Sequence, residues 1–356
     1  MIARPRKHRR WRLQAAALLL LAISFATSCN DAGPMGVPEI SGVEVAVVVN
    51  SVDISVSVFP VDSPLAGRSI GLAQAGSPVS LAARGHLAIV PLGLVSAAAV
   101  VDLRTAAVTA IALPDNSGAT GAAFINDSIA YVANPNRNSV SVVNVSSGTL
   151  GAEIEVGVFP QAIAAVAGKA FVLNAELDAN FLPARPGRVS VIDPAAEAAI
   201  DTIELSGLNP TAMTTGPDGL LYVVNAGSFG GANGSLSVID PATLRELEHH
   251  VGFGEFPGGI AIDAAGKAYV SSFSYGIAIW DIDSASFVRP PSDPMVVQGH
   301  MLSSGVGFDS AGRLYTLIPG DCVAPSQALR LTTDTFDRAI DVGVCPIAIG
   351  FARLPE

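Results

Sequence analysis

A short strand-like phrase recurs seven times along this chain, and its spacing constrains the fold more than any other feature. Each copy is a mainly apolar run of the type Tyr-Val-x that closes on Asn or on another turn-forming residue. Successive copies lie 41, 43, 40, 51, 47 and 46 residues apart. A period in the forties accommodates four short strands, which make one blade of a β-propeller. The copies begin at Val47, Ala88, Tyr131, Phe171, Tyr222, Tyr269 and Tyr315.

Each copy continues with the same order of strands and turns, which is clearest in the third. Residues 140–144 alternate between apolar and polar side chains, which predicts a strand with one buried face. A Gly-x-x-Pro segment at 157–160 interrupts the pattern, because Gly lets the backbone leave a strand and Pro cannot donate a hydrogen bond. Residues 162–166 do not alternate and are expected to form the innermost strand, buried on both faces. The Asn or Asp that closes a strand is expected to cap the following turn.

The two ends of the repeat region predict how the ring closes. The repeats begin with the second strand of a blade, near Glu44, and finish with an unmatched inner strand at 347–351. Pairing that last strand with the first three completes seven blades of four antiparallel strands and hides both open edges. The fold class is therefore predicted to be all-β, a seven-bladed propeller over residues 43–356.

Three phrases together resemble a known family. Tyr-Val-Val-Asn at 222–225, Val-Ser-Val-Ile-Asp at 189–193 and Gly-Leu-Asn-Pro at 207–210 are similar to the YVTN repeat of surface-layer-type β-propellers. The likeness covers residues 43–353, although Pro91 and Ser272 replace the Asn in two copies. The resemblance implies a non-catalytic platform that binds or scaffolds other molecules at the cell envelope.

The N-terminal residues have the pattern of an export signal. Six basic residues precede an apolar stretch at 13–25, which ends in Ala-Thr-Ser-Cys at 26–29. Small residues before a Cys resemble the bacterial lipobox, except that Ala26 stands where Leu is usual. We expect a lipoprotein signal peptide at 1–28 and a lipidated Cys29 that anchors the protein in a membrane, with a linker at 29–42; cleavage without lipidation is the alternative. Asn30, in place of Asp, favours the outer membrane, on its periplasmic side or at the cell surface.

Charge excludes one class of partner. The chain has a formal net charge of −11, and removal of residues 1–28 leaves 14 basic against 31 acidic residues, a net charge of −17. Such a surface disfavours binding to nucleic acid and electrostatic docking to anionic lipid. The partner is therefore expected to be an unidentified protein, small molecule or polysaccharide.

Two cysteines remain besides Cys29, and both are predicted to lie at one end of the ring. In an up-and-down blade, the loops after the second and the fourth strand emerge at the same end, which we name the top face. Cys322 follows the second strand of the last blade and Cys345 follows its fourth. In an exported protein such a pair predicts a disulfide, with two free thiols as the alternative.

The top face is also where the repeat carries its longest insertions, at 175–187, 226–234 and 293–304. Loops on a rigid scaffold are the usual place for binding, and the mouth of the axial channel opens on the same face. The candidate top-face binding residues are Asn180, Phe181, Arg185, Arg188, Phe229 and His300.

The sequence gives no support for a catalytic, metal or cofactor site. It has no Cys-x-x-Cys, His-Glu-x-x-His or Gly-x-Ser-x-Gly motif, and the neighbouring His249 and His250 would point to opposite faces of a strand. We therefore predict no catalytic residue, no metal and no cofactor. Two alternatives stay open: a lactonase-like hydrolase, and a passive companion subunit of a periplasmic redox enzyme.

Overall fold

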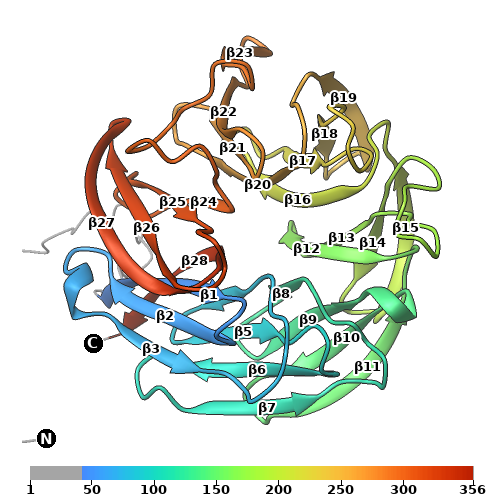
Figure 1. Ribbon diagram of the computed structural model, residues 1–356. Coiled ribbons are helices and arrows are strands. Elements are labelled where there is room, and N and C mark those ends of the chain that lie inside the picture. The colour runs from blue at the N-terminus through green and yellow to red at the C-terminus, as the bar shows by residue number, and fades with distance from the viewer. Residues whose placement is uncertain (1–41, 356) are drawn as a thin grey trace, which may run out of the picture. The chain divides into compact units, whose positions relative to one another are not determined.

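The computed structural model describes residues 42–355, which form seven four-stranded antiparallel sheets arranged as blades around a central axis (Figure 1). This confirms the predicted seven-bladed propeller. Within each blade the strands follow one another from the axis outward, in chain order, except at the ring's closure.

The first three blades hold eleven of their twelve strands in the N-terminal half of the described chain. Blade 1 comprises β28 (Pro346–Pro355), β1 (Gly42–Asn50), β2 (Ser55–Pro60) and β3 (Arg68–Gly71), with the 3₁₀ turn η1 (Pro64–Ala66) before β3. Blade 2 comprises β4 (Ala82–Arg84), β5 (Leu87–Pro91), β6 (Ala97–Asp102) and β7 (Val108–Ala112). Blade 3 comprises β8 (Ala122–Phe124), β9 (Ile129–Asn134), β10 (Ser139–Asn144) and β11 (Thr149–Glu155), with η2 (Pro135–Arg137) after β9.

The other four blades follow without interruption. Blade 4 comprises β12 (Pro160–Val166), β13 (Lys169–Asn174), β14 (Arg188–Asp193) and β15 (Ala198–Glu204). Blade 5 comprises β16 (Pro210–Thr215), β17 (Leu221–Asn225), β18 (Ser235–Asp240) and β19 (Arg245–Val251). Blade 6 comprises β20 (Pro257–Ile262), β21 (Lys267–Ser272), β22 (Gly276–Asp281) and β23 (Ser286–Arg289). Blade 7 comprises β24 (Gly305–Phe308), β25 (Leu314–Ile318), β26 (Pro325–Thr332) and β27 (Thr335–Val344).

The ring closes by pairing its last strand with its first. β28 runs antiparallel to β1 from the pair Gly42 and Pro355 to the pair Asn50 and Pro346. The predicted closure is thus confirmed, and it places the tail of the described chain on the axial side of its head. β28 covers the inner edge of β1, which removes a template for pairing with other chains.

The hydrophobic core is divided among the interfaces between blades. Seven clusters of buried side chains are present in the described residues, and each joins one blade to the next around the ring. The second strands are buried on both faces because each packs between two neighbouring blades; Tyr131 is 1% exposed and Phe171 is fully buried. This explains why the apolar phrase that recurs every 40 to 51 residues is the strongest pattern in the sequence.

The innermost strands differ from the prediction that they are buried on both faces. In β12 only Pro160 and Ile163 are buried, and the other residues are half-buried or exposed. The reason is that one side of each inner strand lines an open axial hollow. The lack of polar alternation in these strands therefore reflects an apolar lumen wall and not complete burial.

The Asn that ends the second strand also has a role other than the expected turn cap. Asn134 is fully buried, and its Nδ2 donates to Ser139 Oγ at 3.1 Å and to Ser141 Oγ at 2.9 Å across the blade. Asn50, Asn174 and Asn225 donate to third-strand serines in the same way. Turn capping is performed instead by the residue that ends the third strand; Asp240 Oδ1, for example, accepts from Ala242 N.

The same Asn explains the Gly of the Gly-x-x-Pro segment. A Cβ on Gly207 would lie 2.2 Å from Cγ of Asn225, and a Cβ on Gly157 would lie 2.7 Å from Cγ of Asn174. Such distances leave no room for a larger residue, so the buried Asn and the Gly of the preceding loop are a matched pair. The Pro that closes the segment is the first residue of the inner strand in blades 1, 4, 5 and 6, where its missing N–H breaks no regular pairing.

Candidate functional site

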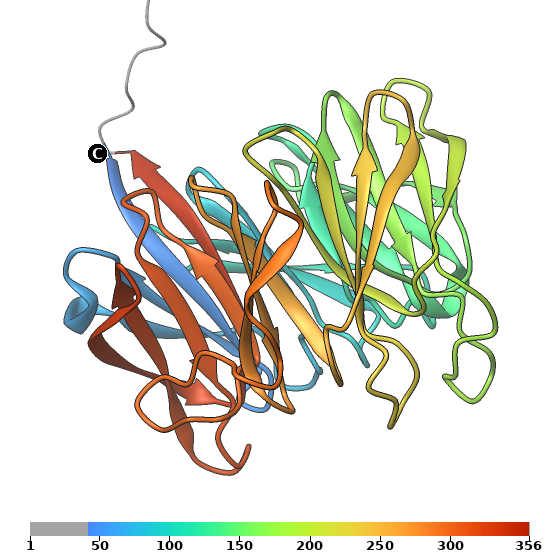
Figure 2. The same cartoon turned by 90° about the horizontal axis from the view of Figure 1, so that it is seen from above.

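The top face is the end of the ring that carries the long loops, and the described chain begins and ends at the opposite end. Figure 2 shows the start of β1 and the end of β28 together at one end, with the long loops projecting from the other. Eleven of the nineteen exposed large apolar side chains of the described residues lie in top-face loops. They are Val52, Val79, Leu94, Phe181, Leu182, Phe229, Phe273, Val296, Met301, Leu302 and Val323.

Two of these apolar residues stand on aromatic partners. Phe181 packs edge-to-face on Phe159 with ring centroids 5.7 Å apart, and Phe229 packs on Phe256 at 5.3 Å. Phe159 and Phe256 occupy the third place of their Gly-x-x-Pro segments, with φ of 58° and 47°. This left-handed backbone is unfavourable for a bulky residue, so the loops are held there by their packing. Phe181 and Phe229 nevertheless remain 66% and 80% exposed.

The axial mouth is a hollow of about 510 Å³ at the top of the ring. Its walls are apolar side chains and glycines of the inner strands, together with Phe273 from the loop between β21 and β22. The polar side chains of its lining are uncharged; no residue that lines it carries an ionisable group. These polar residues are Ser80, Thr120, Gln161, Thr211 and Ser304.

Most of these polar side chains bind the neighbouring blade. Ser80 Oγ donates to Thr120 O at 2.5 Å, and Thr120 Oγ1 donates to Gln161 O at 3.2 Å. Gln161 Nε2 then donates to Asn209 Oδ1 at 2.9 Å, and Ser304 Oγ donates to the carbonyl of Pro346 at 2.6 Å. This series links blades 2, 3, 4 and 5, and blade 7 to blade 1. The mouth is therefore a braced opening and not a set of independent loops.

The two candidate arginines are already paired with carboxylates. Arg185 contacts Glu176 at 2.5 Å, and Arg188 contacts Glu204 at 2.9 Å. Glu176 is only 2% exposed, and its Oε1 has no hydrogen-bond partner among the described residues. The sequence analysis did not single out Glu176, although an acid at the start of a long insertion that also contains Arg185 was a usable signal.

A third top-face arginine is neutralised in the same way. Arg137 forms a bidentate pair with Glu153, with Nε–Oε1 and Nη2–Oε2 distances of 2.6 and 2.9 Å. The hydrogen bond from Arg137 lowers the pKa of Glu153, with a further contribution from Ser139. All three arginines in or beside the top-face loops of blades 3 and 4 are thus occupied by acids of their own blade.

Several acids of the top-face loops, in contrast, form no ion pair with another described residue. Asp178 and Asp321 accept backbone N–H groups of their own loops, which lower the pKa of both carboxyls. The carboxyls of Asp178 and Asp321 are therefore exposed and ionised at neutral pH. The set is Asp53, Asp115, Asp178, Glu255 and Asp321.

The structure separates the other predicted site residues. Asn180, Phe181 and Arg185 share one loop, and Phe229 stands on the next blade. His300 lies on the loop from β23 to β24, beside Met301, Leu302 and Pro319 around a hollow of about 330 Å³. No group of three or more His, Cys, Asp or Glu side chains in residues 42–355 is placed to hold a metal ion.

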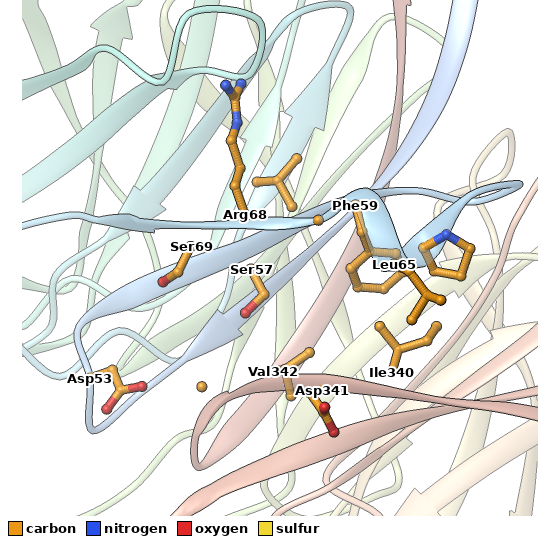
Figure 3. Close-up of a pocket in the computed structure, with 13 residues that line it drawn as sticks. Asp53, Ser57, Phe59, Leu65, Arg68, Ser69, Ile340, Asp341 and Val342 are labelled. Carbon is orange, nitrogen blue, oxygen red and sulfur yellow. The ribbon is translucent and has the colours of Figure 1, made fainter.

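A second hollow, of about 420 Å³, lies on the flank of the ring where blade 7 meets blade 1 (Figure 3). Ser57, Phe59 and Leu65 line it from blade 1, and Ile340 and Val342 line it from blade 7. The guanidinium of Arg68 turns away from it and donates to the carbonyl of Arg104 at 3.0 Å. Asp53 and Asp341 also line the hollow, which is therefore a gap of mixed polar and apolar lining at the seam, separate from the axial mouth.

The two cysteines meet at the top of this seam. Cys322 and Cys345 form a disulfide that joins the loop after β25 to the residue just before β28. This confirms the predicted pair. Asp263 and Asp309 directly follow two inner strands and lie at the end opposite the top face, where Asp309 Oδ2 accepts from Arg313 Nε at 2.6 Å.

The described residues form a seven-bladed β-propeller with an open axial mouth, and comparisons with known proteins agree on the fold. A chain of the Kuenenia stuttgartiensis hydrazine synthase superposes with a TM-score of 0.62 at 18% identity, covering 78% of this chain and 90% of that one. A functionally unknown protein from Desulfotomaculum acetoxidans gives 0.64 at 14% identity, covering 87% and 99%. No protein-family model and no curated protein matches the sequence.

Three predictions lie outside the described residues. These are the signal peptide at 1–28, the lipidation of Cys29 and most of the linker at 29–42. Within residues 42–355 no helix has the length and apolar character needed to cross a bilayer.

Proposed function

We propose that this protein is a non-catalytic docking platform that binds a partner protein through its top face, at the envelope of a bacterial cell. The observation that carries the proposal is the concentration of exposed apolar side chains on the top-face loops, with Leu94 at 88%, Phe229 at 80% and Val323 at 80% exposure. Exposed apolar side chains that gather on one face commonly mark a protein interaction site. A few large side chains, often aromatic, typically supply most of the binding energy at such a site.

The geometry of the chain ends suits a tether. β1 starts at the end opposite the top face, so a lipid on Cys29 would hold the ring by its lower end and leave the docking loops free. The 13 residue steps from Cys29 to the start of β1 at Gly42 can span at most about 45 Å when fully extended. Lipidation, export to the outer membrane and kinship with YVTN-repeat propellers are parts of this proposal.

A companion subunit of a redox enzyme is the second candidate. The fold likeness to a chain of a hydrazine synthase supports this candidate, because it places a propeller of similar architecture in an enzyme. In this role the present chain would again act through its top face, and the partner would be the catalytic subunit. A hydrolase is less well supported, because the residues lining the axial mouth include no group able to activate water.

Site-specific photo-crosslinking tests the docking face. A photoreactive amino acid replaces Leu94 or Phe229 in the full-length protein expressed in its own host, and replaces Leu65 as a control. Leu65 is 85% exposed but lies in the β2–β3 connection at the opposite end. We expect one discrete adduct from both top-face positions and none from Leu65. Adducts of equal yield from all three positions, or none from any, would reject the top face as the docking surface.

A further inference from the structure

We propose that the axial mouth is the anchor socket of the docking face and that its occupant is an apolar, preferably aromatic, side chain of a partner segment flanked by basic residues. The inference rests on the proposed docking function and names the chemistry of the partner. It follows from two independent properties of the top face, the lining of the socket and the charge of its surroundings.

The socket fits an uncharged group. Its volume of about 510 Å³ lies within the usual range of ligand pockets, and no ionisable side chain lines it. Ile163, Met213 and Ile260 form its wall, and Phe273, 42% exposed, stands at its rim. A charged group placed there would lose water without gaining a counter-charge, whereas an apolar side chain would bury both itself and the wall.

The hydroxyl and amide groups of the socket do not alter this conclusion. The donor hydrogens of Ser80, Thr120 and Ser304 are directed to carbonyls of the neighbouring blade, and Gln161 reaches Asn209. These groups brace the opening and are mostly satisfied without a ligand. A well-packed, rigid socket surrounded by apolar loops is the geometry in which an interface anchor contributes most.

The surroundings of the socket favour basic flanks. Arg137, Arg185 and Arg188 are each held by a carboxylate of their own blade. Asp53, Asp115, Asp178, Glu255 and Asp321 form no ion pair within 4 Å in the described chain, although Asp115 lies near Arg137. The residual field over the top face is therefore negative, which speeds the approach of a basic segment and repels an acidic one. The same field opposes docking of the top face on an anionic bilayer.

Gly258 offers a way to block the socket without disturbing the fold. It lines the mouth, and a Cβ built on it meets no atom within 4 Å, so a Gly258→Phe side chain has room to enter the hollow. Gly71 ends β3, the outermost strand of blade 1, so it lies far from the axis, and a Cβ built on it also meets no atom within 4 Å. Gly71→Phe is therefore the matched control.

The experiment uses the mature chain and three fluorescein-labelled peptide amides. The first is Lys-Lys-Gly-Trp-Gly-Lys-Lys, the second has Ser for Trp, and the third has Glu for every Lys. Fluorescence anisotropy gives the Kd of each at 50 and 500 mM salt. We expect the first peptide to bind at least about tenfold more tightly than the other two, and more weakly at high salt. Gly258→Phe should abolish the preference for Trp, and Gly71→Phe should keep it.

Every other outcome overturns the inference. Equal binding of the Trp and Ser peptides removes the anchor, and equal binding of the Lys and Glu peptides removes the charge preference. Unchanged binding by Gly258→Phe places the contact elsewhere; if that variant does not fold by circular dichroism, Phe273→Ser takes its place. Cosedimentation with phosphatidylglycerol vesicles, lost on substitution of Leu94 by Ser, would assign the face to a lipid surface. The crosslinking result is independent of all these, so docking can stand while the socket fails.

Discussion

The disulfide at the seam gives the most quantitative prediction from this structure. Cys322 and Cys345 are separated by 23 residues, and the closed loop contains β26 and β27 of blade 7. A crosslink over such a loop lowers the chain entropy of the unfolded state by about 11 cal/mol/K in the loop-closure model, or about 3 kcal/mol at 25 °C. The perturbation is the double substitution Cys322→Ser with Cys345→Ser, which avoids leaving a single free thiol.

The expected loss is measured by urea unfolding of the two proteins under identical conditions. The variant should lose about 3 kcal/mol in the free energy of unfolding, with a lower midpoint, provided that the transition remains two-state. Wild type treated with a reducing agent should lose the same amount, and the variant should not respond to that agent. Val323→Ser, in the same loop, is the control for loss of an exposed side chain.

The location of the bond adds a second readout. Cys345 directly precedes β28, and β28 closes the ring on β1. Hydrogen exchange should therefore accelerate in β28 and β1 of the variant more than in β13 and β14 of blade 4. A loss below about 1 kcal/mol would refute stabilisation by loop closure in the unfolded chain. Acceleration spread evenly over all blades would refute a local contribution of the bond to the seam.

Three further substitutions test the fold at other points. Asn134→Ala leaves two buried serine hydroxyls without their donor and should lower the free energy of unfolding in urea by about 1–3 kcal/mol. Asn144→Ala, at an exposed turn cap, should cost less, and equal losses would contradict a structural role of the buried Asn134 hydrogen bonds. Gly121→Ala would bring a Cβ to 2.3 Å from the carbonyl oxygen of Gln161 in the next blade and should clearly lower the urea concentration at the unfolding midpoint. Gly71→Ala, whose Cβ would contact no atom, should leave that midpoint unchanged. Equal midpoints for the two variants would contradict the close approach of Gly121 to Gln161. The pKa of Glu153 is lowered in the folded protein, so its pair with Arg137 stabilises the fold above the unfolded pKa of about 4.5, and this stabilisation is lost as pH falls through the folded pKa. Arg137→Gln should therefore reduce the loss of unfolding free energy between neutral and acidic pH. The same pH dependence in wild type and variant would exclude the pair as a contributor.

The architecture was predictable because its signals repeat. The Tyr-Val-x-Asn phrase recurs because each second strand packs between two blades, and Tyr131, Phe171 and Tyr315 are all buried in that position. Ring closure followed from counting strands at the two ends, since 347–351 had no partner unless it met the segment near Glu44. The disulfide followed from the same count, because the second and fourth strands end at one face.

The candidate site was less predictable, because its properties depend on pairs that are distant in sequence or hidden in a repeat. Arg188 and Glu204 are 16 residues apart and meet only because β14 and β15 pair. The apolar wall of the axial mouth comes from one to three residues of each blade, none of which is unusual alone. The close approach of Gly207 to Asn225 was equally hidden, because the sequence explained Gly207 as a strand breaker and Asn225 as a turn-forming residue, with no link between them.

The register between Gly42 and Pro355 has a practical consequence. Head and tail of the described chain are adjacent, antiparallel strands at the end away from the docking loops. A short peptide could therefore join them, and the polypeptide could be reopened in an exposed turn of another blade, giving a circular permutant that keeps all seven sheets. Reporter domains fused to either end of the described chain would lie at this end of the ring and leave the top face available for capture assays.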